Sequence, residues 1–137
     1  MSGRDVTVSD VAIVACAVSA GIHAALAPAH LHEGRFAGAA FAASAVVLGG
    51  LAVWLTARPA GTAPLAVTAT ALAGLLGAYA LAVTTGVPLL HAEPEPVDPL
   101  ALFTKAAEAA GLVAALAVVQ RRHAPPTSTP RTRGTNA

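Results

Sequence analysis

The chain has 137 residues, the size of one domain, and a net charge of +1. Hydrophobic residues make up 55% of it and charged residues 11%, against about 25% charged residues in ordinary soluble domains, so a soluble protein is not expected. Its one cysteine, Cys16, excludes an intrachain disulfide. Because the sequence contains no phosphate-binding loop, nucleophile–base pair or basic patch for nucleic acid, we expect neither an enzyme nor a nucleic-acid-binding protein.

Four long apolar stretches follow one another along the chain, at about residues 11–31, 35–57, 65–85 and 100–120. A helix of roughly 20 residues crosses a hydrocarbon core of about 30 Å. These stretches are apolar on every face, which leaves no polar side to meet water. The sequence therefore predicts an all-α fold, a bundle of four transmembrane helices that run up, down, up and down.

Local signals mark the ends of three of these helices. Ser9 or Asp10 is expected to cap the N-terminus of the first helix, and Asp98, followed by Pro99, that of the fourth. Gly86 is expected to end the third helix, because glycine adopts the left-handed conformation that commonly closes a helix.

The basic residues predict how these helices are oriented in the membrane. With alternating helices, one group of arginines falls at the same end of the bundle: Arg4, Arg58, Arg121, Arg122, Arg131 and Arg133. Only Arg35 and Lys105 fall toward the other end. Since cytoplasmic loops carry the excess of Lys and Arg, we expect a plasma-membrane protein with both termini in the cytoplasm. Residues 1–8 and 122–137 are then cytoplasmic tails, the second disordered, and residues 9–121 form the membrane domain.

Three polar residues lie inside the predicted spans at similar depth. At a rise of about 1.5 Å per residue, His23 and Glu108 lie about 12 Å below the outer boundary and Tyr79 about 9 Å below it. Polar groups at that depth normally face the bundle interior, paired with one another. We therefore expect His23 to contact Glu108, with Tyr79 as a candidate third member. Lys105 either competes for this carboxylate or extends to the outer interface. The layer either locks helix packing or forms a proton or ligand site.

A second group of polar residues lies in the two predicted outer loops. Its histidines and glutamates are His30, His32, Glu33, His91 and Glu93. Imidazole and carboxylate groups suit Zn²⁺ or Cu²⁺, and the spacing of His30 and His32 lets two rings converge from an extended segment. The group predicts a divalent metal site or a surface for an extracytoplasmic partner. The alternative is that these are solvated loop residues that cap helices.

Several short motifs resemble a family of small four-helix integral membrane proteins of actinobacteria. They are His-x-Ala-Leu-x-Pro-x-His at residues 23–30, Gly-x-Pro at 86–88, Glu-Pro at 95–96 and Thr-Lys-x-x-Glu at 104–108. The resemblance covers roughly residues 15–115 and implies the four-helix topology. It implies no activity, because none is established for the family.

Taken together, the sequence predicts a small multi-pass membrane protein, not an enzyme, that binds a divalent metal or an extracytoplasmic partner at its outer face. One alternative is an accessory subunit of a larger membrane complex, in which the layer of His23 and Glu108 only locks helix packing. Another is a proton-coupled carrier working through the same two residues. The expected partners are the lipid bilayer and another membrane protein or a second copy of the chain.

Overall fold

The computed structural model describes residues 3–58, 61–87 and 93–124; the side chains of residues 3–7 and of Glu33 are outside this description. Its four helices are α1 (Gly3–Glu33), α2 (Arg35–Ala57), α3 (Thr62–Thr84) and α4 (Pro99–His123). Each of them is long and apolar enough to cross a membrane. The all-α fold is therefore confirmed, and each predicted span lies in a helix long and apolar enough to cross a membrane.

The ends of the helices confirm two of the three local signals. The Asp98 carboxylate accepts hydrogen bonds from the backbone N–H groups of Leu100 (2.8 Å) and Ala101 (3.0 Å) and so caps α4. Gly86, two residues after the end of α3, has a φ of 72°, in the left-handed region that favours glycine.

The predicted start of the first helix is wrong. α1 begins at Gly3, so residues 3–8, expected to form a tail, are helical, and Ser9 lies buried inside the helix instead of capping it. The physical reason is that no proline or glycine interrupts residues 4–10, and isolated polar residues cost a helix only a few tenths of a kcal/mol each, roughly. At the other end of the chain, the predicted disordered tail falls largely on residues 125–137, outside the described part.

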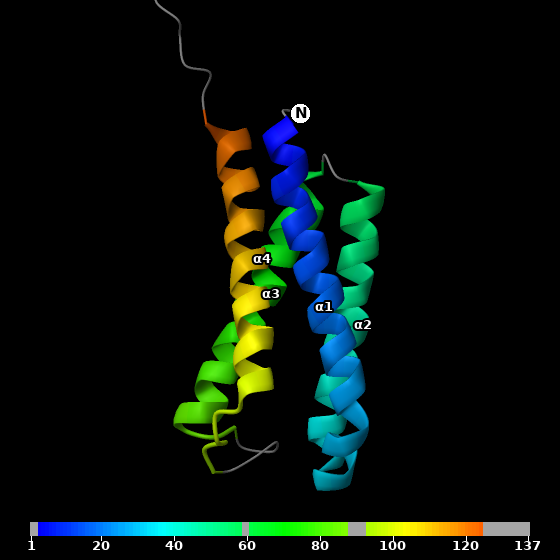
Figure 1. Ribbon diagram of the computed structural model, residues 1–137, viewed down its shortest axis with the longest axis vertical. Coiled ribbons are helices and arrows are strands. Elements are labelled where there is room, and N and C mark those ends of the chain that lie inside the picture. Colours follow the sequence, from blue (N-terminus) through cyan, green and yellow to red (C-terminus); the bar gives the residue numbers. More distant parts are fainter. Residues whose placement is uncertain (1–2, 59–60, 88–92, 125–137) are drawn as a thin grey trace, which may run out of the picture.

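The helices form an antiparallel bundle in which α1 lies beside α2 and α4, and α3 lies beside α4 (Figure 1). α2 and α3 touch each other only sparingly. The start of α1, the end of α4 and the α2–α3 connection lie at one end, called here the arginine end after Arg58, Arg121 and Arg122. The opposite end is called the histidine end, after His30 and His32 in the last turn of α1.

The core is packed most tightly from the middle of the bundle toward the arginine end. Two clusters of buried side chains fill it: Ala12, Leu55, Leu65, Ala69, Ala114, Ala115 and Val118, and then Cys16, Leu48, Leu51, Ala52 and Leu72. At Gly111 of α4 an added Cβ would lie 2.6 Å from Cβ of Ala15, so the missing side chain lets α1 and α4 approach closely. Large apolar residues such as Val46 and Val53 are exposed on the outside, where lipid would cover them.

Candidate functional site

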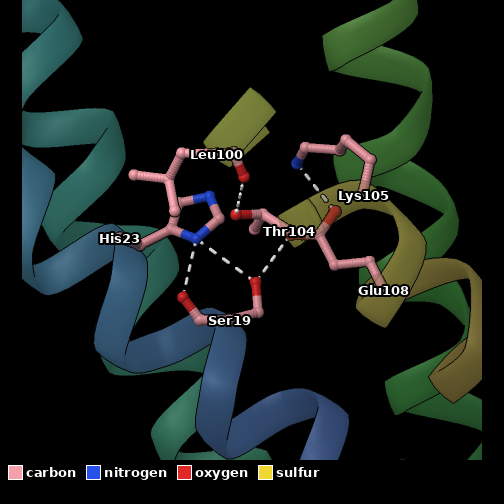
Figure 2. Close-up of polar contacts among 6 residues, drawn as sticks. All are labelled: Ser19, His23, Leu100, Thr104, Lys105 and Glu108. Carbon is pink, nitrogen blue, oxygen red and sulfur yellow. Dashed lines mark hydrogen bonds and ion pairs between the residues drawn. The ribbon is translucent and has the colours of Figure 1, made fainter. Parts of the chain in front are cut away.

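A buried carboxylate, Glu108, is the centre of a polar chain toward the histidine end (Figure 2). Its Oε1 accepts a hydrogen bond of 2.6 Å from Ser19 Oγ, and its Oε2 lies 2.7 Å from Lys105 Nζ. The side chain of Glu108 is wholly buried and that of Lys105 is 15% exposed. Both carboxylate oxygens are thus bonded, and the opposite charge of Lys105 compensates the negative charge inside the bundle.

The imidazole of His23 continues this chain. Its Nδ1 lies 2.8 Å from the backbone carbonyl oxygen of Ser19 and 3.3 Å from Ser19 Oγ (Figure 2). A carbonyl oxygen can only accept, so Nδ1 carries a proton, and in the neutral ring Nε2 then carries the lone pair. The hydrogen bonds of this chain then run in one direction: His23 donates to Ser19, and Ser19 donates to Glu108. The Ser19 carbonyl orients the ring, and Glu108, by accepting from Ser19 Oγ, leaves the oxygen of that hydroxyl facing Nδ1 as an acceptor.

The predicted pair of His23 and Glu108 is therefore a relay through Ser19, not a direct contact. Lys105, foreseen as a competitor, binds the carboxylate, and the opposite charges of the two groups strengthen this hydrogen bond. Ser19 was not singled out in the sequence. Its signal was available, since it precedes His23 by four residues and so lies on the same face of α1.

Tyr79 of α3 belongs to the same layer through its ring. Lys105 Nζ lies 5.6 Å from the ring centroid, within the range of a cation–π contact. The Tyr79 hydroxyl is buried and has no hydrogen-bond partner among the described residues. The phenol therefore presents an unsatisfied donor in a largely apolar setting, where such a group costs free energy until it finds a partner.

A cavity of about 290 Å³ lies between the four helices at the histidine end. Its polar wall comes from His23, His30, Tyr79, Thr104 and Lys105, and the connection before α4 adds Glu95 and Asp98. Most of the remaining wall consists of alanine, leucine and other apolar side chains. An apolar cavity with a few converging polar groups is the usual form of a small-molecule site, and this volume is near the lower end of the usual range.

Phe41 of α2 lies against both histidine rings of α1. Its ring centroid is 5.3 Å from that of His23, at a tilt of 36°, and 3.9 Å from that of His30, nearly parallel to it. His30 Nδ1 lies 3.0 Å from the carbonyl oxygen of Leu26, so this ring has the same tautomer as His23. This role of Phe41 could not be predicted from the sequence, because which α2 residue faces α1 depends on how the helices pack.

The predicted metal ligands differ in burial and in position. His30 is half-buried in the cavity wall, whereas His32 and Glu93 are exposed. The Glu33 side chain and His91 lie outside the described residues. Within the described part of the chain, no three His, Cys, Asp or Glu side chains are grouped so as to hold a metal ion. The metal site predicted from the sequence stays a prediction.

No protein-family model, curated protein or solved structure matches the chain. The resemblance to the actinobacterial membrane family therefore stays a prediction as well. The functional inference rests on the geometry of the polar chain and of the cavity beside it.

Proposed function

We propose that this chain is a multi-pass membrane protein that binds a small ligand in the cavity at its histidine end. The single observation that carries the proposal is the setting of His23. Its Nδ1 is bonded to Ser19, so Nε2 is the nitrogen that remains to accept a hydrogen bond, and the ring lines a cavity of about 290 Å³. A buried acceptor of fixed orientation within an apolar wall is suited to hold a ligand, because little ordering entropy is lost on binding.

We also propose that the membrane is the plasma membrane, with both termini in the cytoplasm and the cavity in the outer half. The support is the placement of the basic side chains. Arg58, Arg121 and Arg122 lie at the arginine end, which also holds the start of α1 and the end of α4. Positively charged loops stay on the cytoplasmic side, which assigns the histidine end to the outside.

The proposal is tested by filling the cavity. Ala78 of α3 lines it and is itself exposed, so Ala78→Phe adds a large side chain there without displacing buried core residues. Ala80→Phe is the matched control, since Ala80 is exposed on the same helix and does not line the cavity. Wild type and both variants are purified in lipid nanodiscs, and the small molecules that they retain are extracted and identified by mass spectrometry.

We expect a molecule that wild type and Ala80→Phe retain and Ala78→Phe loses. If the three proteins retain the same molecules in the same amounts, the cavity is not a binding site. The polar chain would then serve only to lock helix packing, as in an accessory subunit.

A divalent metal is the second candidate ligand, and one observation favours it. His23 and His30 both donate from Nδ1 to a backbone carbonyl, a contact that metal-binding imidazoles commonly make. The same preparations are therefore analysed for zinc and copper. Metal held by wild type and lost in His30→Ala and His91→Ala supports this candidate, and metal-free wild type contradicts it.

A further inference from the structure

A second cavity lies beside the cavity at the histidine end, between α2 and α3. This second cavity, also about 290 Å³, is lined by Ala43, Ser44, Val47, Leu48, Ala71, Gly74 and Leu75. Two of these residues, Ser44 and Leu75, also line the first cavity. The two spaces are therefore adjacent; together they are called the recess, and the second one alone is called the α2–α3 groove.

The groove exists because α2 and α3 touch each other least among the neighbouring helices. Its wall is made of small and aliphatic side chains, and an added Cβ at Gly74 would meet nothing within 4 Å. Ala43, Val47 and Gly74 are exposed, on the outer surface that lipid would cover. The groove follows α3 from Leu75 to Ala71, about 6 Å at about 1.5 Å per residue, and the recess from Tyr79 to Ala71 spans about 12 Å. Its composition and length suit a hydrocarbon chain.

The polar end of the recess favours an uncharged head group. Lys105, the cation that the described residues place in this wall, is already paired with Glu108, Asp98 caps the first turn of α4, and Glu95 has an interaction of its own. An anionic head would therefore meet no cation without a partner, and a cationic head would meet no carboxylate without a partner. Uncharged polar groups avoid both penalties.

Two hydrogen-bonding groups of opposite kind line this end. His23 and Tyr79 line the cavity: with Nδ1 of His23 bonded to Ser19, Nε2 of the neutral ring can accept a hydrogen bond, and the buried Tyr79 hydroxyl, which has no partner among the described residues, can donate one. A hydroxyl group on a ligand satisfies both, since it donates to His23 and accepts from Tyr79. Phe41 and Tyr79 add two aromatic rings to the wall, which favours a ring on the ligand.

We propose that the ligand is a lipid-soluble phenol, with its hydroxyl between His23 and Tyr79 and its hydrocarbon tail in the α2–α3 groove. This inference rests on the proposed function and names the ligand class of that site. The tail reaches the groove from the bilayer, where it is already in an apolar medium. The tail concentrates the ligand in the membrane and fits the groove, while the phenol head group supplies the hydrogen bonds.

The inference is tested with probes that share one part and differ in the other. Saturable binding of radiolabelled para-decylphenol is measured on the full chain in nanodiscs, with protein-free nanodiscs subtracted. Para-cresol keeps the head and lacks the tail; decyl phosphate and decyltrimethylammonium keep the tail and carry a charged head. Gly74→Leu fills the groove, and Gly77→Leu is its control, because Gly77 also has open space and lines neither cavity.

We expect Gly74→Leu to weaken binding of para-decylphenol about tenfold through steric overlap with the tail, and to leave para-cresol unchanged. Gly77→Leu should bind both probes as wild type does. Tyr79→Phe should weaken both phenols about fivefold, through one lost hydrogen bond. Both charged probes should bind more weakly than para-decylphenol.

The outcomes separate this inference from the proposed function. Equal binding of para-decylphenol by wild type and Gly74→Leu overturns the assignment of the groove to the tail. Binding of decyl phosphate or decyltrimethylammonium as tight as that of the phenol overturns the uncharged head. In both cases, sensitivity of para-cresol to Ala78→Phe still supports the cavity as a binding site. If Ala78→Phe changes the binding of no probe, the proposed function fails together with the inference.

Discussion

Toward the arginine end the four helices are held by alanine, leucine and valine side chains, whereas toward the histidine end they enclose a polar chain and a cavity. Gly111 lies in the closed part, where α4 nearly touches α1 at Ala15. One turn earlier on α4, Glu108 is joined to α1 through Ser19 instead. The same pair of helices thus changes from contact between small residues to contact between polar side chains.

This difference shows what can hold helices together inside a membrane. Apolar side chains gain little from leaving lipid for another helix, so close packing of small residues and hydrogen bonds must supply the attraction. The closed part uses the first means and the polar part uses the second. Hydrogen bonds fix only a few points of contact, and the bundle can therefore keep an unfilled space beside them.

The largest expected effect comes from breaking the ion pair of the polar part. Lys105→Met should lower the free energy of unfolding by about 3–5 kcal/mol, because it leaves the wholly buried Glu108 carboxylate without its cation. The double variant Lys105→Met/Glu108→Met should recover much of this loss, since neither charge is then buried alone. The stabilities of the single and the double variant are measured by unfolding the purified proteins in mixed micelles. Equal stability of Lys105→Met and wild type would show that the ion pair contributes nothing to stability.

An intermediate effect is expected where the closed part is tightest. Gly111→Ala places a Cβ 2.6 Å from Cβ of Ala15 and 3.1 Å from Cδ1 of Leu72, and should cost about 1–3 kcal/mol. Gly77→Ala, on the open surface of α3, should instead raise stability by up to about 1 kcal/mol through better helix propensity. Both are measured in the same micelle assay. If both variants changed the free energy of unfolding in the same direction, the packing of α1 against α4 would not depend on this close approach.

The smallest expected effect compares two buried hydroxyls. Thr68 Oγ1 is buried and has no partner among the described residues, so Thr68→Val should raise stability by about 1 kcal/mol. Ser19 is just as buried, but its hydroxyl donates to Glu108, so Ser19→Ala should lower stability by about as much. The melting temperatures of the two variants are measured side by side. A lower melting temperature for Thr68→Val than for Ser19→Ala would contradict this prediction.

Much of the fold could be predicted from the sequence because hydropathy and helix caps are local properties. The four spans follow from runs of apolar residues, and the start of α4 follows from Asp98 and Pro99. The same local reasoning failed at Ser9, where a residue that often caps helices lies inside one. A capping residue permits a helix to begin but does not prevent it from continuing when nothing else breaks it.

The depth of the candidate-site residues along the membrane could be predicted from the sequence, but the contacts between their side chains could not. Counting residues along each helix placed His23, Tyr79 and Glu108 in one layer, and Lys105 and Ser19 connect the three in the structure. The count gives height along the membrane and leaves the facing direction of each side chain open. For that reason Lys105 could only be foreseen as a competitor, and Ser19 and Phe41 were missed.

The sequence by itself determined that the chain forms four apolar helices of membrane-spanning length, with polar groups at matching heights in three of them. Only the tertiary structure decided which of these groups bond, that Ser19 stands between His23 and Glu108, and that a cavity opens beside them. The reason is physical: rise per residue is the same in every α-helix, so height can be counted, whereas rotation and separation are set by side chains from other parts of the chain. Glycine at residue 111 draws two helices together and the sparse contact of α2 with α3 leaves a groove, and neither consequence is visible in a single helix.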